Sequence, residues 1–103
     1  MRVPLLLASM LVLASCSWVD LEDAARQVAL VGPQDITECQ QLSHVTAKVM
    51  DGMGPFSRNK AKMGEELATI ARNEAARLGG DTVVPSSSIV DGRQHFTVYR
   101  CNQ

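Results

Sequence analysis

The stretch SRNKAKMGEELATIARNEAARL, residues 57–78, is the clearest structural element of the sequence. Apolar residues recur in it every three or four positions, which is the period of an amphipathic α-helix. Ser57 or Asn59 is suited to cap its start, and Gly79 stands where a left-handed C-terminal cap is expected. We therefore expect one long helix with an apolar stripe that faces the core. The stripe consists of Met63, Leu67, Ile70, Ala71, Ala75 (or Glu74) and Leu78.

The opposite face of this helix is polar. Charged side chains three or four positions apart pair readily on an exposed helix surface. We therefore expect this face to be solvated, and a partner-binding role for it is the alternative. Its residues are Glu65, Glu66, Arg72, Asn73 and Arg77.

Strand patterns lie on both sides of the helix. Residues 42–50 (LSHVTAKVM) alternate between apolar and polar, as in a half-buried strand, and residues 28–31 (VALV) predict a further short one. After the helix come residues 82–85 (TVVP) and 94–101 (QHFTVYRC), the latter behind an Asp91-Gly92 hairpin signal. This order predicts an α+β fold, with one long helix packed on a small, mainly antiparallel sheet of three to four strands.

The first sixteen residues have the features of an export signal. Arg2 is positive, and residues 3–14 (VPLLLASMLVLA) are twelve residues without a charge. A helix needs about 20 residues to span a bilayer, so this run has the size of a signal-peptide core instead. Leu13-Ala14-Ser15-Cys16 resembles the bacterial lipobox. The resemblance implies that residues 1–15 are cleaved off and that Cys16 carries the lipid, with several acyl chains making the anchor durable.

The residue after the lipidated cysteine bears on location. In lipoproteins of Gram-negative bacteria, Asp there favours retention in the inner membrane, so Ser17 implies the outer membrane, with the domain facing the periplasm. Residues 16–27 are then the lipidated anchor and a short linker, and residues 28–103 the folded domain. The alternatives are an ordinary secretory signal with an incidental Cys16, or an uncleaved apolar segment.

Cys39 and Cys101 remain once Cys16 is assigned to the lipid. The periplasm is oxidising, so this even pair predicts a disulfide, and closing a loop of about 60 residues stabilises a domain by about 4 kcal/mol. If the early strand and the last strand are antiparallel neighbours, the two sulfurs meet at one end of the sheet. The alternative is a tetrahedral metal site that adds His44 and His95, although the spacings are not those of compact zinc motifs.

The rest of the composition argues against several activities. The net charge of −1 gives no basic surface for nucleic acid. The sequence has no GxSxG, HExxH, phosphate-loop or CxxC motif. We therefore expect a protein that is not an enzyme and needs no cofactor or metal. Its expected partners are the membrane, through the lipid, and another envelope protein.

Several stretches resemble a family of small outer-membrane lipoproteins of unknown function. They are ELATIARNEAA (66–76), LGGDTVV (78–84) and VYRC (98–101), together with the lipobox and Cys39. The pattern is similar to the C-terminal domain of the envelope-stress lipoprotein RcsF, although RcsF has four domain cysteines and a long proline-rich linker. The resemblance implies an RcsF-like α+β domain that acts as an interaction module in envelope sensing or maintenance. The alternative is a small ligand- or metal-binding periplasmic module.

Overall fold

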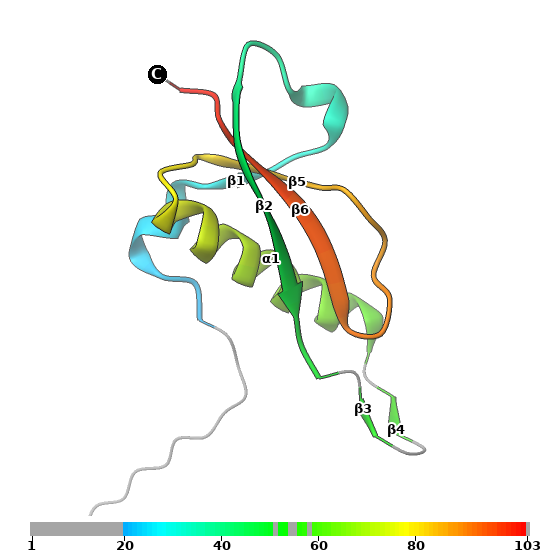
Figure 1. Ribbon diagram of the computed structural model, residues 1–103. Coiled ribbons are helices and arrows are strands. Elements are labelled where there is room, and N and C mark those ends of the chain that lie inside the picture. Colours follow the sequence, from blue (N-terminus) through cyan, green and yellow to red (C-terminus); the bar gives the residue numbers. More distant parts are fainter. Residues whose placement is uncertain (1–19, 51, 54–55, 58, 103) are drawn as a thin grey trace, which may run out of the picture.

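A computed structural model describes residues 20–50, 52–53, 56–57 and 59–102 of the chain. The predicted signal peptide, residues 1–15, and the predicted lipidation site, Cys16, lie outside these residues. The described part folds as one long helix, α1, packed on a four-stranded sheet that is mostly antiparallel (Figure 1). The α+β class predicted from the sequence is confirmed. No helix among the described residues is long and apolar enough to cross a bilayer.

The main sheet has the strand order β1-β5-β6-β2. β1 runs parallel to β5, whereas β5 with β6 and β6 with β2 are antiparallel. Two further short strands pair as a separate hairpin, and two 3-10 helices precede β1 and β2. The strands are β1 (Ala29–Leu30), β2 (Gln40–Lys48), β3 (Gly52–Met53), β4 (Phe56–Ser57), β5 (Thr82–Pro85) and β6 (Arg93–Arg100), and the 3-10 helices are η1 (Asp23–Gln27) and η2 (Pro33–Asp35).

The hairpin turn before β6 forms where the sequence predicts it. Asp91 has φ 53° and Gly92 has φ 74°, and a type I′ turn requires positive φ at both central residues. Val90 and Arg93 exchange backbone hydrogen bonds across the turn. The turn returns the chain as β6, which lies between β5 and β2.

The start of α1 (Lys60–Arg77) is fixed by a side-chain cap. Asn59 has extended backbone angles, and its side-chain oxygen accepts a hydrogen bond from the Lys62 N–H at 3.1 Å. This contact satisfies one of the N–H groups that a helix leaves without a partner at its start. Of the two predicted caps, Asn59 is therefore the one used, and Ser57 belongs to β4.

The end of α1 is a Schellman motif. Gly79 has φ +82°, its N–H donates to the Ala76 carbonyl, and the Gly80 N–H donates to the Ala75 carbonyl. A Cβ at Gly80 would lie 2.4 Å from Val98 Cγ1, so this position requires glycine for close approach to β6. The predicted C-terminal cap is confirmed.

The core lies between α1 and one face of the sheet. Phe96, Leu67, Val83 and Val98 are its largest fully buried side chains. The predicted helix stripe is buried at four positions, half-buried at Ile70 and wrong at Leu78, which is 40% exposed because the helix ends at Arg77. The buried stripe residues are Met63, Leu67, Ala71 and Ala75.

Candidate functional site

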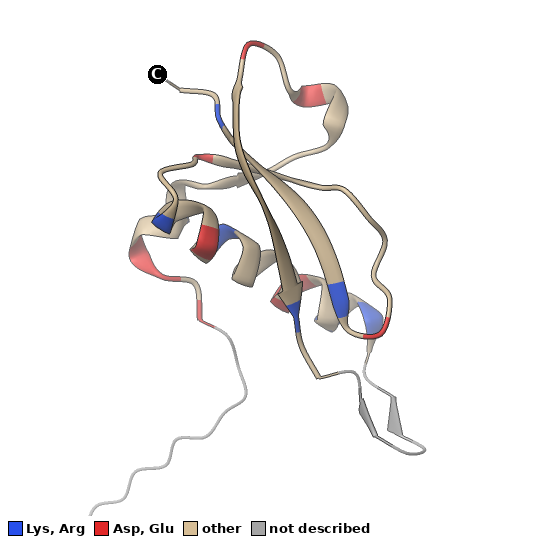
Figure 2. Cartoon of the chain, viewed as in Figure 1, with Lys and Arg blue, Asp and Glu red and all other residues tan. Residues whose placement is uncertain are grey.

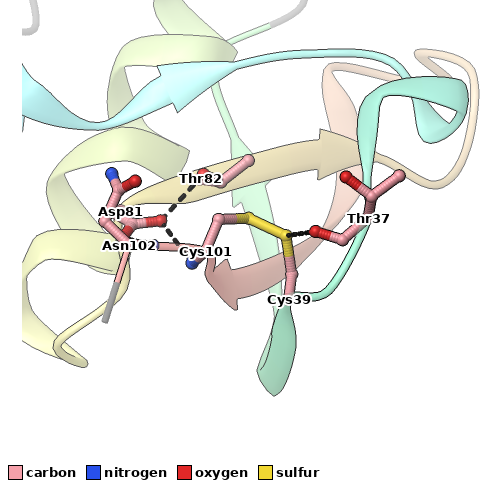
Figure 3. Close-up of a disulfide and its surroundings, with 6 residues drawn as sticks. All are labelled: Thr37, Cys39, Asp81, Thr82, Cys101 and Asn102. Atoms are coloured by element: carbon pink, nitrogen blue, oxygen red, sulfur yellow. Dashed lines mark hydrogen bonds between the residues drawn. A yellow bond between two sulfur atoms is a disulfide. The ribbon is translucent and has the colours of Figure 1, made fainter.

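A disulfide closes one end of the sheet. β2 and β6 are paired from Gln40 opposite Arg100, which places the next residues outward, Cys39 and Cys101, side by side with a Cα–Cα distance of 4.2 Å (Figure 3). Glu38, just before Cys39, adopts φ 54°, a left-handed conformation that turns the chain into β2. The predicted bond between the two cysteines forms for the predicted reason, the antiparallel pairing of their strands.

The Asp81 carboxylate holds the C-terminal side of this disulfide in place. Its two oxygens accept hydrogen bonds from the backbone N–H groups of Cys101 and Asn102, each at 2.8 Å (Figure 3). The Thr82 hydroxyl donates to the same carboxylate at 2.8 Å, and the Asp81 N–H donates to the Tyr99 carbonyl. Asp81 therefore ties the end of β6 to the turn that joins α1 to β5.

These contacts also set the ionisation of Asp81. Partial burial acts to raise the pKa of its carboxyl group, but the backbone hydrogen bonds from Cys101 and Asn102, the Thr82 hydroxyl and the charge of Arg100 act to lower it. The net effect is a pKa below the ordinary aspartate value of 3.8. Hydrogen bonds that a carboxylate accepts stabilise its charged form, so the clamp is strongest when Asp81 is ionised.

The four residues of the predicted metal alternative do not come together. Both sulfurs are used by the disulfide. His44 and His95 lie on the sheet face away from the core, where their Nδ1 atoms contact the hydroxyls of Thr97 at 3.2 Å and Thr46 at 2.9 Å. His95 is six residues along β6 from Cys101, or about 20 Å at the rise of a strand. Among the described residues, no three potential ligands converge.

The predicted solvation of the polar helix face is wrong at two positions. Glu66 and Asn73 are each only 6% exposed, and Arg72 is half-buried. The residues that cover the C-terminal half of this face come from the start of the described chain, residues 20–28, which we call the docked segment. Its Ala25 is fully buried against the core.

Two helix side chains hold the docked segment by its backbone. The Asn73 side-chain oxygen accepts from the Glu22 N–H at 2.8 Å, and its amide nitrogen donates to the Asp20 carbonyl at 2.9 Å. Arg72 donates to the Val28 carbonyl at 2.7 Å and to two carbonyls of η1. Much of the stretch predicted as a linker, residues 16–27, therefore packs on α1 from Asp20 onward.

The match to a known protein family agrees with a domain that starts near Asp20. Residues 19–101 match the family described as "Domain of unknown function (DUF4156)". The chain belongs to this family. The match begins at residue 19, so the DUF4156 domain includes the docked segment that covers α1. No curated protein and no solved structure matches the chain significantly.

The DUF4156 domain has a groove beside the free edge of β2. This β2–α1 groove is a depression of about 260 Å³ lined by Val45 and Thr46 of the strand and Ile70 and Glu74 of the helix. Val45 and Ile70 are half-buried and pack at the border of the core. The groove therefore offers an apolar floor next to the exposed backbone of a strand.

A second depression, of about 270 Å³, lies at the loop between β5 and β6. Ser87, Asp91 and His95 are among the residues that line it, a combination that in other settings supports nucleophilic catalysis. Here the Ser87 hydroxyl donates to the Ser88 carbonyl and accepts from the His95 backbone N–H, and the imidazole contacts Thr46. These bonds use Ser87 to shape the loop.

Sequence reasoning missed the roles of Asp81, Arg72 and Asn73. Asp81 follows Gly79-Gly80, and a lone Asp after a helix cap has no signal that distinguishes it from a turn residue. Asn73 is a polar residue in a helix otherwise rich in Ala, Glu and Arg, where burial of its amide would require backbone partners. Only the position of the docked segment supplies those partners.

Proposed function

We propose that this chain is a lipid-anchored, non-enzymatic interaction module at the periplasmic side of the bacterial outer membrane, acting in envelope sensing or maintenance. The lipobox ending at Cys16 and the following Ser17 support the anchor and the membrane. The disulfide supports the compartment, because such bonds persist in oxidising surroundings and are rare in the cytosol.

The docked segment is the observation that most strongly supports the proposal. Asn73 holds the backbone of Asp20, so only residues 17–19 separate the packed domain from Cys16. Even when fully extended, the chain from Cys16 to Asp20 spans at most about 14 Å. The domain is thus held against the leaflet that contains the lipid, and any partner has to reach it there.

This geometry distinguishes the proposal from a signalling role copied from RcsF. A short tether prevents the domain from reaching across the periplasm, so a partner approaches from the periplasm or lies in the same membrane. The docked segment covers much of the helix face, whereas the outer face of the sheet, with His44, Thr46 and His95, is exposed. We therefore place the contact with a partner on the sheet side.

The anchor is tested by two substitutions next to each other. Cys16→Ser removes the lipid-accepting sulfur, and we expect the protein to appear in the soluble periplasmic fraction. Ser17→Asp keeps the lipid, and we expect the protein to move to inner-membrane fractions on a density gradient. Retention of the Cys16→Ser variant in outer-membrane fractions would contradict the anchor, and an unchanged gradient position for Ser17→Asp would contradict the sorting.

The interaction role is tested by photo-crosslinking in intact cells. A photoreactive residue at exposed His95 is expected to capture a discrete protein, identified by mass spectrometry. The same residue at Asp35, exposed in η2, is the matched control. If His95 captures nothing beyond what the Asp35 control captures, the sheet face has no partner and the proposal fails there.

A further inference from the structure

The two edges of the main sheet differ in what they expose. β1, at one edge, has two residues and is followed by Pro33, so it offers little backbone for another strand. β2, at the other edge, has nine residues, no proline and a single charged side chain, Lys48, at its end (Figure 2). Within the described part of the chain, no strand pairs with the outer side of β2.

The register shows which backbone groups point outward. The Val49 N–H donates to the Gly92 carbonyl at 2.8 Å, and antiparallel pairing alternates between residues that face the neighbouring strand and residues that face away. Val49, Ala47 and Val45 therefore direct their backbone groups toward β6. The backbone groups of His44, Thr46 and Lys48 point out of the sheet. In agreement, the His44 carbonyl accepts a hydrogen bond from the Ser43 hydroxyl at 3.4 Å and not from β6.

The groove next to this edge adds an apolar surface to the outward-facing backbone groups of β2. Val45 and Ile70 form its apolar lining, and Thr46 brings the outward-facing backbone to its rim. A strand added along β2 would pair with the backbone and place alternate side chains over the groove. One added strand would therefore cover both exposed features.

We propose that the added strand is β2 of a second copy of this chain, paired antiparallel about a two-fold axis normal to the sheet. Such an interface is isologous, and it joins the two sheets into one. Outward-facing residues have to pair with each other, which is met when Val45 lies opposite Val45 of the second copy. His44 then lies opposite Thr46 on the outer face, and the two grooves adjoin on the helix side.

Charge does not oppose this occupant. In an antiparallel pair centred on Val45, Lys48 is the only charged side chain of β2, and the two copies of Lys48 lie near opposite ends of the interface. Like charges directly opposite each other would oppose pairing, and no like charges face each other in this arrangement.

The position at which the chain leaves the domain favours this dimer, an argument that rests on the proposed lipid anchor. Asn73 points away from the sheet and holds Asp20, so the chain leaves the domain on the helix side. A two-fold axis normal to the sheet keeps both helices, and hence both chain ends, on the same side. Both lipid anchors then enter a single leaflet.

A substitution at Thr46 tests the pairing with little effect on the fold. Thr46→Pro removes an N–H that points out of the sheet, and proline is tolerated on an edge strand in that position. Thr46→Val is the matched control, because it removes the hydroxyl and keeps the N–H. Light scattering on the full-length protein in detergent is expected to give a dimer for the wild type and Thr46→Val and a monomer for Thr46→Pro.

A charge swap tests the register and covers the case in which Thr46→Pro fails to fold. His44→Lys with Thr46→Lys places like charges opposite each other at two sites, as does His44→Glu with Thr46→Glu. We expect each variant alone to dimerise at least about tenfold more weakly, and the mixture of the two to recover a heterodimer. The far-UV circular dichroism spectrum of each variant, compared with that of the wild type, verifies that it is folded.

The outcomes separate this inference from the proposed function. A monomeric wild type, a dimer that persists in the charged variants, or a mixture that does not recover overturns the pairing at β2. None of these measurements depends on where the lipid places the protein. If Cys16→Ser stays in the membrane while the charge swap behaves as expected, the anchor fails and the dimer stands.

Discussion

Replacing Cys39 and Cys101 together by serine removes the only described covalent link between the start of β2 and the end of β6. Both strand ends keep other contacts in the folded state. β2 and β6 remain paired from Gln40 opposite Arg100, and Asp81 still accepts hydrogen bonds from the backbone of residues 101 and 102. We therefore expect the folded state to change little and the unfolded state to gain conformational freedom.

The size of the effect follows from the length of the loop. The bond joins residues 62 positions apart, for which the chain-entropy model gives about 4 kcal/mol. A folded domain of this size has a total stability of roughly 4–12 kcal/mol. Loss of the disulfide is thus expected to remove between a third and all of the free energy of unfolding.

Urea denaturation followed by circular dichroism measures this loss. The double serine variant and the reduced wild type are expected to lose the same free energy of unfolding, because both remove only the cross-link. Cys16→Ser is the matched control, since Cys16 takes no part in the bond, and its domain is expected to keep wild-type stability. Thiol labelling of unreduced wild-type protein verifies the starting state.

Two results would refute this reasoning. A loss below about 1 kcal/mol would mean that the unfolded chain is not restrained by the bond as the entropy model requires. A large loss in the serine variant that reduction of the wild type does not reproduce would assign the effect to damaged packing.

Three further substitutions test other contacts. Because the folded pKa of Asp81 is lowered, its carboxylate stabilises the fold at pH values above the unfolded pKa of 3.8, and this stability is lost as the pH falls through the folded pKa. Asp81→Asn should therefore reduce the fall of the free energy of unfolding with acid pH, measured by urea titrations at several pH values, and an unchanged pH dependence would contradict the clamp. Gly80→Ala places a Cβ 2.4 Å from Val98 Cγ1 and should cost about 1–3 kcal/mol in thermal unfolding, and a neutral result would show that β6 can move away. Asn73→Ala should cost about 1–3 kcal/mol and speed amide exchange in residues 20–28 while leaving β6 protected, and equal exchange in wild type and variant would show that Asn73 does not hold the segment.

Local patterns were sufficient for most of the secondary structure. The period of residues 57–78 predicts α1 because an amphipathic helix has to turn its apolar side to a core. Asp91-Gly92 predicts the hairpin because few residues adopt two positive φ angles in succession. Both features depend on neighbours in the sequence, so both could be read before the fold was known.

The polar side of the same helix could not be read in this way. Periodicity assigns Glu66 and Asn73 to the surface, because it locates the face away from the sheet. It does not indicate that another part of the chain returns to cover that face. Asn73 is buried because the docked segment supplies the backbone partners of its amide, more than 50 residues away in sequence.

The sequence by itself determined the helix, the strands of the main sheet, the turn and, through cysteine count and expected compartment, the disulfide pair, but not the short strands β3 and β4. The features that it determined depend on local period, on turn chemistry and on simple pairing. The tertiary structure alone decided the clamp by Asp81, the docking of residues 20–28 on α1 and the position of β2 at a free edge with a groove beside it. Each of these is a contact, or an open position, between segments far apart in the chain, and no local pattern specifies which segments the packed chain brings together.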